Sequence, residues 1–226
     1  MGRAAVKKEK EIAIIEPANI VKTVISIRGT SPLLQNKFSN KAKAAMMKAM
    51  TTTKAEKKSK NARELRDFDE DFQQAQYIST AGWNGIPCSS FRNAMIAACR
   101  TVNMVMTQAK MSIFVLADGF DSEDGTPLVR IVGDRPERND APVRLPNGSF
   151  DIRIRPMWRE WECKIQVTFD ADMVTPESVV NLLDRAGKQV GVGEGRPFSR
   201  NSCGQGYGTF EVVETETEKP RKAKKA

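Results

Sequence analysis

The chain has 226 residues, of which 40% are apolar, and a formal net charge of +8. That apolar content is enough to bury the core of one large domain, which excludes a chain that is disordered throughout. The excess of Lys and Arg lies at the two ends, in residues 1–10 and 219–226, while residues 11–218 are formally neutral. A polyanionic partner would therefore have to bind a local cluster of basic side chains.

Cysteine, histidine and apolar segments set further limits. The four cysteines lie far apart without CxxC spacing and the sequence contains no histidine, so we expect no metal site and no cofactor. Residues 118–124 are acidic but lack the full order of a calcium-binding loop, and we predict a solvated turn there. No apolar segment approaches the roughly 20 residues that cross a bilayer, and no apolar signal core follows Met1. We expect a cytoplasmic protein without a membrane partner.

Residues 1–18 are predicted to form a basic arm, followed by a strand at residues 19–28. Val21, Ile25 and Ile27 share one face of this strand, and a GTSP turn closes it. The next segment predicts a basic amphipathic helix, with apolar and basic residues on different sides. Its apolar positions are Phe38, Ala42, Ala45, Met46 and Ala49, and its lysines are Lys37, Lys41, Lys43 and Lys48.

Residues of about 51–80 are predicted to be an insertion into the domain. The stretch from Thr51 to Lys60 has no apolar pattern, so it predicts an excursion from the core. Leu65, Phe68 and Phe72 then recur at helical spacing. We expect a short helix there.

A third helix is predicted after the Gly-Ile-Pro sequence at 85–87. Ser89 or Ser90 is suited to cap this helix, because a serine hydroxyl accepts hydrogen bonds from first-turn amides. The amides left free in the first turn would attract an anion. The expected buried positions are Phe91, Met95, Ala98 and Val102.

From about residue 112 to 170 the apolar pattern changes to a period of two. Ile152 and Ile154 alternate with two arginines, and the apolar positions from Trp161 to Phe169 alternate strictly. These two runs predict an antiparallel hairpin. Residues 118–126 and 135–148 are rich in charge, Pro and Gly, and we expect surface loops there.

A last helix is predicted to start at Thr175, with Pro176 in its first turn and Gly187 near its end. A strand at 209–213 follows, and the Lys-rich residues 215–226 predict a disordered tail. The buried stripe of the helix is expected to be Val179, Leu182, Leu183 and Ala186.

Glycines alternate on both sides of a short basic loop between this helix and the last strand. A row of residues without side chains lets another backbone come close, and Arg196 and Arg200 add positive charge, so the loop suits a phosphodiester chain. The other reading is that the glycines let strands of the fold cross tightly. A dinucleotide-binding fingerprint fits poorly, since the run leads into a strand and not a helix. The glycines are Gly191, Gly193, Gly195, Gly204, Gly206 and Gly208.

The predicted elements approximate a βαββαβ order, which is an α+β, ferredoxin-like or RRM-like antiparallel core with a basic helical insertion and extra loops. Three strings, at 27–33, 86–94 and 191–210, are similar to the RAMP superfamily, the RNA-binding backbone subunits of CRISPR effector complexes. The general design also resembles phage and prophage proteins of this type. The resemblance covers residues 19–214, which we take as a single domain.

In the RAMP superfamily, the segment after the first strand, the following helix start and the glycine loop lie along the nucleic acid. The resemblance therefore implies contacts by Asn36, Lys37, Ser89, Ser90 and Arg92, and by the loop from Gly193 through Gly206 to Gly208. Relatives that cut RNA carry an aspartate after the first strand or use histidine, and this chain has neither. These departures imply binding without cleavage.

The residues themselves add candidates to this site. Lys41, Arg196 and Arg200 are cations near the expected path of the phosphates, and Trp83 and Phe198 are aromatic side chains suited to stack on bases. We expect a sequence-tolerant protein that binds single-stranded RNA or DNA and assembles side by side along the strand, as the resembling family does. The alternatives are a phage structural or assembly protein that uses the same surfaces for protein contacts, and a metal-dependent nuclease. If the protein is phage-encoded, its place would be the bacterial host cytoplasm.

Overall fold

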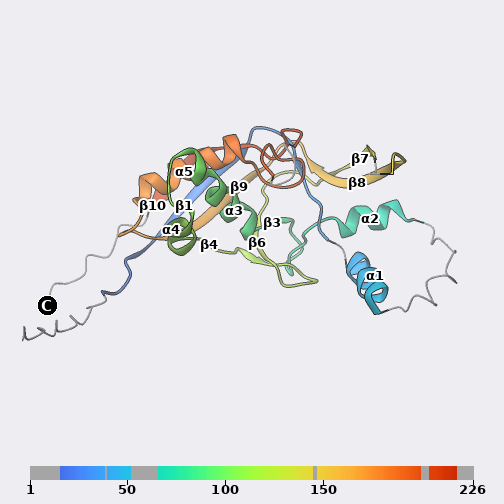
Figure 1. Cartoon of the computed structure of the whole chain (residues 1–226), viewed down its shortest axis with the longest axis horizontal. Helices are drawn as coiled ribbons and strands as arrows, with labels where there is room; N and C mark the ends of the chain where they lie inside the picture. The colour runs from blue at the N-terminus through green and yellow to red at the C-terminus, as the bar shows by residue number, and fades with distance from the viewer. Residues whose placement is uncertain (1–15, 39, 52–65, 145–146, 200–203, 218–226) are drawn as a thin grey trace, which may run out of the picture.

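A computed structural model describes residues 16–38, 40–51, 66–144, 147–199 and 204–217 of the protein. These residues form an α+β structure with antiparallel sheets (Figure 1). The helices are α1 (Asn40–Thr51), α2 (Phe68–Gln74), α3 (Cys88–Ala98), α4 (Met106–Ser112) and α5 (Pro176–Gln189), with a 3₁₀ turn at Cys99–Thr101. The strands are β1 (Ile20–Gly29), β2 (Leu33–Leu34), β3 (Gly85–Pro87), β4 (Ile113–Val115), β5 (Gly119–Phe120), β6 (Pro127–Arg130), β7 (Glu137–Arg144), β8 (Phe150–Trp158), β9 (Glu162–Asp170) and β10 (Phe210–Thr217).

The main sheet has four strands in the order β10-β1-β9-β4, and every neighbouring pair is antiparallel. Its central pair, β1 and β9, places Ile25 opposite Ile165 and Ile27 opposite Cys163. The alternation predicted for both strands is confirmed, because these side chains are buried. Helix α3 lies in the chain between β1 and β4, and α5 lies between β9 and β10.

Helices α3 and α5 cover one face of the main sheet (Figure 1). Phe91 of α3 and Trp161 beside β9 both meet the ring of Phe210 on β10, with ring centroids 5.8 and 6.1 Å apart in edge-to-face geometry. Gly187 lets α5 approach β10, since a Cβ there would lie 2.2 Å from the Phe210 carbonyl oxygen. The core therefore joins the first and last strands through both helices.

Helix α5 forms as the sequence predicts. The Thr175 hydroxyl accepts a 3.2 Å hydrogen bond from the Ser178 amide, and Pro176 is the first helical residue. The helix ends at Gln189, two residues beyond the predicted stop at Gly187. Its stripe of Val179, Leu182, Leu183 and Ala186 is buried.

The predicted hairpin of the two alternating runs is wrong. β8 pairs with β7 and β2, whereas β9 pairs with β1 and β4, so the runs belong to different sheets. The partner of β8 is the segment predicted as a loop at 135–148, of which Glu137–Arg144 is strand β7. β7 alternates between exposed and half-buried positions and faces no core, so its sequence shows no apolar alternation. Its charged residues and Pro142 therefore predicted a loop. In Figure 1 the β7–β8 hairpin extends away from the main sheet, on the side of α2.

Two further predictions about helices were half right. Helix α1 forms from Asn40, so Lys37 and Phe38 precede it, and the predicted apolar positions Phe38 and Met46 are 50% and 53% exposed. Met47 and Met50 of the same helix are 69% and 80% exposed. Helix α3 ends at Ala98, and Val102 is exposed instead of continuing its buried stripe.

The predicted boundaries of the domain also shift. Strand β10 runs to Thr217, which pairs with Thr23, so residues 215–217 belong to the sheet and not to a tail. The basic arm up to residue 15, residues 52–65 of the predicted insertion and the tail from 218 lie outside the described residues. Within the insertion, α2 forms where a short helix is predicted, capped by Asp67. Among the described helices, each is too short or too polar to cross a bilayer.

Candidate functional site

Three segments far apart in sequence line one cavity of about 410 Å³, which we call the α3 cavity. They are the segment after β1, the end of β3 with the helix α3 that follows it, and the glycine loop after α5; Tyr77 adds to the wall. These are the three segments that the sequence singles out. The lining includes Leu33, Gln35, Asn36, Tyr77, Ile86, Pro87, Ser90, Asn93, Ala94, Ala97, Val190 to Glu194, Arg196, Phe198 and Ser199.

A second cavity of about 680 Å³, the hairpin cavity, adjoins the first. Glu194, Arg196 and Ser199 line both cavities and form their common wall. The rest of its lining comes from the β7–β8 hairpin, including Arg153 and Arg155, and from the second half of the glycine loop around Tyr207. The two cavities together make a path from α3 to the hairpin.

The glycine loop is built by close contacts within the chain. Gly208 has a φ of +67°, and a Cβ there would lie 1.8 Å from the Val192 carbonyl oxygen. Gly193 (φ +78°) packs in the same way against the carbonyl oxygen of Leu34, to which the Glu194 amide donates a 2.9 Å hydrogen bond. At these two positions the glycines let segments of the fold itself cross tightly, which is the second interpretation of the glycine row. Gly206 differs, because a Cβ there would meet no atom within 4 Å.

The predicted serine cap of α3 is wrong. The helix starts at Cys88 after Pro87, whose side chain cannot cap, so Ser89 and Ser90 lie inside the first turn. Ser90 lines the α3 cavity, whereas Ser89 is exposed and lines neither cavity. The sequence analysis placed the N-cap at a serine, whereas the N-cap residue is Pro87.

Lys37 is not free to contact a phosphate. Its Nζ lies 2.7 Å from Asp121 Oδ1 and 2.9 Å from Glu123 Oε2, and its side chain is 4% exposed. Burial lowers the pKa of the Lys37 ammonium, but the hydrogen bonds to both carboxylates outweigh burial and hold the pKa above its ordinary value. The ammonium also lies 5.6 Å from the ring centre of Tyr77, a wall of the α3 cavity. Lys37 therefore supports the cavity from behind.

Asp121 was expected in a solvated turn, and the structure buries it instead. Its Oδ1 accepts hydrogen bonds from Lys37 and from the amides of Glu123 and Asp124, while its Oδ2 is buried without a partner among the described residues. The carboxylate thus closes the 121–126 turn and fixes the segment after β1 to it.

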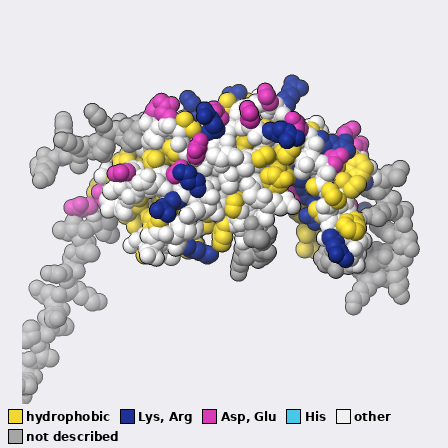
Figure 2. Space-filling model, turned by 90° about the horizontal axis from the view of Figure 1, so that it is seen from above, with side chains coloured by type: hydrophobic (Ala, Val, Ile, Leu, Met, Phe, Trp, Pro, Cys, Tyr) yellow, Lys and Arg dark blue, Asp and Glu magenta, His cyan; other side chains and the backbone are white. Residues whose placement is uncertain are grey.

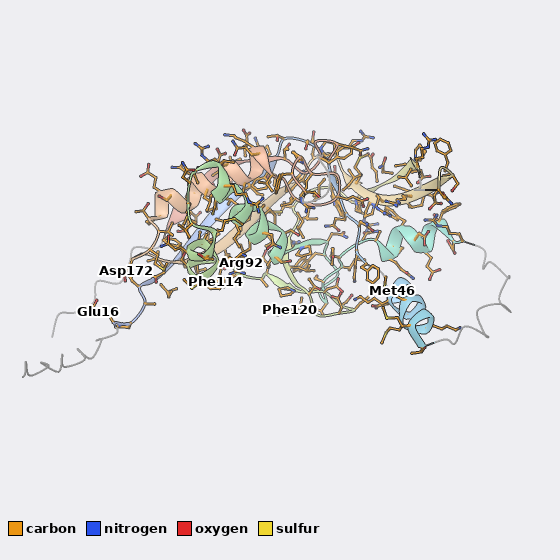
Figure 3. The ribbon with its side chains drawn as sticks, in the orientation of Figure 1. Glu16, Met46, Arg92, Phe114, Phe120 and Asp172 are labelled. Carbon is orange, nitrogen blue, oxygen red and sulfur yellow. The ribbon has the colours of Figure 1, made fainter. Side chains whose placement is uncertain are left out.

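Arg92 points away from both cavities. Its guanidinium donates to the carbonyl oxygens of Ile113 and Lys110 and lies 4.8 Å from the ring centre of Phe114, beside which Figure 3 shows it. It joins α3 to α4 and β4. Arg92 thus has a role within the fold, and its contact with nucleic acid stays a prediction.

Trp83 is also used within the fold. A Cβ at Gly119 or at Gly85 would lie 2.7 or 2.9 Å from its indole ring, so the ring packs over these two glycines. It lines neither cavity. Stacking of a base on Trp83 is not supported by this position.

Of the remaining predicted residues, Asn36, Gly193, Arg196 and Phe198 line the α3 cavity. Arg200 lies outside the described residues, and so does the side chain of Lys41.

The sequence analysis missed several lining residues. Arg153 and Arg155 were read only as the outward positions of a strand, yet both face the hairpin cavity. Arg155 pairs with Glu194 at the common wall of the cavities. Their alternation with Ile152 and Ile154 was the available signal. Asn93 and Tyr77 carried no comparable pattern.

The charges on the surface are interspersed. On the face that Figure 2 shows, Lys and Arg side chains alternate with Asp and Glu side chains, without a continuous basic patch. Within the hairpin cavity, Arg153 and Arg196 form no ion pair with a described residue, and Arg196 donates to the Gly193 carbonyl oxygen at 2.9 Å. These two guanidiniums are the positive charge that the site offers to an anion.

Comparison with known proteins adds no identification. No family model matches the chain, and a search of curated proteins finds no match.

Proposed function

We propose that this protein binds single-stranded nucleic acid, RNA or DNA, with little sequence preference, along the α3 and hairpin cavities. One observation carries the proposal: three segments separated by up to about 160 residues line one cavity, and this cavity adjoins a second one lined by arginines. Guanidiniums attract phosphates whatever the base sequence, and aromatic side chains stack on any base.

The phosphates belong in the hairpin cavity. Arg153 and Arg196 have no carboxylate partner among the described residues, so each can pair with a phosphate without breaking an ion pair. Arg155 is held by Glu194, and a phosphate there would have to compete with that carboxylate. Binding is thus centred on Arg153 and Arg196.

The half-exposed face of the main sheet is a poorer candidate. Its outward positions on β1 and β9 alternate basic, acidic and uncharged side chains. They include Lys22, Val24, Ser26, Glu162, Lys164, Gln166 and Asp170. An aromatic ring on this face, Phe114 of the edge strand β4, lies opposite Thr168 and already packs against the Arg92 guanidinium, which is 4.8 Å from the ring centre.

We further propose that the main sheet is a ferredoxin-like core and that the chain is related to the RAMP superfamily. The strand order β10-β1-β9-β4, with α3 and α5 as the two connecting helices on one face, supports this assignment. The proposal includes side-by-side assembly on the strand and binding without cleavage.

Fluorescence anisotropy with labelled oligonucleotides of matched sequence in RNA and DNA tests the function. The double variant Arg153→Ala/Arg196→Ala is expected to bind more weakly, by the same factor for unrelated sequences. The slope of log affinity against log salt concentration should fall by about one unit per lost phosphate contact. Lys164→Ala removes one cation from β9 outside both cavities and is the matched control. Unchanged affinity in the double variant, or an equal loss in Lys164→Ala, would contradict the proposal.

Two simple measurements separate the alternatives. Size-exclusion chromatography with absorbance at 260 and 280 nm should show nucleic acid that leaves the protein at high salt, whereas nuclease-insensitive particles would favour an assembly protein. A labelled oligonucleotide should remain intact with magnesium or manganese, and its cleavage would favour a nuclease.

A further inference from the structure

The two cavities differ in chemistry. The hairpin cavity is lined by three arginines and by two carboxylates, Asp140 and Glu194, which pair with Arg138 and Arg155, whereas the floor of the α3 cavity is apolar and buried. The charged side chains that line the α3 cavity, Glu194 and Arg196, stand at the wall that it shares with the hairpin cavity. The floor consists of Leu33, Ile86, Ala94, Val190 and Val192.

An apolar floor does not suit a phosphate, because an anion that leaves water for such a surface loses its hydration without gaining a partner. It suits a flat ring with an apolar face. The volume of about 410 Å³ also lies in the range of cavities that hold small organic groups.

The rim of the α3 cavity supplies groups for the polar edge of such a ring. The side chains of Asn36, Ser90 and Asn93 make no hydrogen bond with any residue that the structure describes, and each carries both donors and acceptors. Gln35, by contrast, is fully engaged: its amide nitrogen donates to the Gly85 carbonyl oxygen at 2.7 Å and its oxygen accepts from the Tyr77 amide. The free groups are thus at the mouth of the cavity.

Aromatic side chains complete the lining. Tyr77 is half-buried and backed by the Lys37 ammonium, so its ring is held in place. Phe198 is 39% exposed, with the Arg100 guanidinium 5.8 Å from its ring centre. Both rings offer a surface to a planar ligand.

We propose that the α3 cavity receives one unstacked nucleobase of the bound strand while the hairpin cavity holds the neighbouring phosphates. This inference rests on the proposed function and deepens it. A base in the cavity meets an apolar floor, two aromatic rings and three adaptable polar groups, which explains why any base would be accepted.

The test compares two strands with equal backbone charge: a labelled 12-nucleotide oligothymidine, and the same strand in which every residue is an abasic analogue. The wild-type protein is expected to bind the abasic strand at least about fivefold more weakly, the lower end of the effect of one stacked base. Equal binding of both strands overturns the inference but leaves the proposed function standing. Binding of neither strand overturns both.

A variant locates the effect. Ala97→Phe places a ring at the half-buried wall of the α3 cavity, so it should bind the two strands with nearly equal affinity. Gln108→Phe adds the same ring at an exposed position of α4 outside both cavities and should keep the difference. Circular dichroism and thermal unfolding establish that each variant is folded. If a folded Ala97→Phe protein keeps the full difference, the base lies elsewhere and the inference is wrong.

Discussion

At the scale of single residues, the ion pair of Lys37 and Asp121 is the most consequential interaction. Both side chains are buried, and Asp121 also closes a turn through two amides. Removing one member of such a pair leaves the other charge in the interior without compensation. The segment after β1 thus depends on a lysine that the sequence assigned to ligand binding.

Lys37→Met should therefore lower the free energy of unfolding by about 3–5 kcal/mol. Urea unfolding followed by circular dichroism measures the change. Lys43→Met removes the 3.3 Å pair of Lys43 with Asp124, which is more exposed, and should cost at most about 1 kcal/mol. Similar costs for both variants would show that Lys37 is not held in the interior.

Asp124 makes stability depend on acid pH. Its side chain accepts a hydrogen bond from the Thr126 hydroxyl, which is the main reason that the pKa of this carboxyl falls to about 2. A lowered pKa in the folded state stabilises the protein above the ordinary pKa near 4, and this contribution is lost as the pH falls from about 4 towards 2. In the Thr126→Val variant, the decrease in unfolding free energy between pH 5 and 2 should be smaller than in the wild-type protein. Urea midpoints measured across this pH range show the difference. The same pH dependence in both proteins would contradict the assignment.

Two glycines of the loop offer a matched comparison. Gly208 and Gly206 both have positive φ, but only at Gly208 would a Cβ collide with backbone, at 1.8 Å. Gly206→Ala should cost about 1 kcal/mol of unfolding free energy from the backbone conformation alone, and Gly208→Ala clearly more. Equal costs in chemical unfolding would mean that residue 208 does not pack against the Val192 carbonyl as described.

Sequence reasoning at this scale identified segments better than side-chain roles. It selected Asn36 from the resemblance and Arg196 and Phe198 from their charge and ring in the glycine loop, and all three line the α3 cavity. It did not reveal the structural roles of Lys37 and Arg92, since a cation looks the same in a sequence whether it faces solvent, a carboxylate or a carbonyl oxygen. Long-range partners such as Asp121 decide between these roles.

At the scale of elements, helices with similar amphipathic patterns contribute differently. Met95 of α3 is buried against the main sheet, whereas Met47 and Met50 of α1 are 69% and 80% exposed. Met95→Ala should lower the free energy of unfolding by about 2–5 kcal/mol. The double variant Met47→Ser/Met50→Ser should change it by no more than about 0.5 kcal/mol per site. A large loss in the double variant, measured by urea unfolding, would show that α1 packs against the domain.

The central elements were predictable because their patterns report burial on one face. β1, β9 and α5 each alternate or recur with a clear period, and all three form the core. The pairing of β8 was not predictable, since its partner β7 alternates only between exposed and half-buried positions and carries charged residues and Pro142 in place of an apolar pattern. The β7–β8 hairpin forms one wall of the site, so the sequence alone predicted only the part of the site around α3.

At the scale of the whole molecule, the two cavities lie where the glycine loop meets the segment after β1 and the base of the hairpin. In Figure 3, Arg92 and Phe114 lie on the α4 side, whereas Met46 lies at the other end of the molecule. The pair Arg92–Phe114 and the exposed methionines of α1 therefore belong to different surfaces. The basic termini offer a polyanion a second place to bind, because residues 1–10 and 219–226 carry the net charge. The central claim is that the strand binds in the cavities and not at these ends.

Photo-crosslinking of the full-length protein to an oligonucleotide containing 5-iodouracil, followed by mass spectrometry of the peptides, tests this claim most directly. We predict adducts on peptides that contain Tyr77 or Phe198, the aromatic residues of the α3 cavity. Adducts confined to residues 1–10 and 219–226, or to the outward face of β1 and β9, would contradict the account.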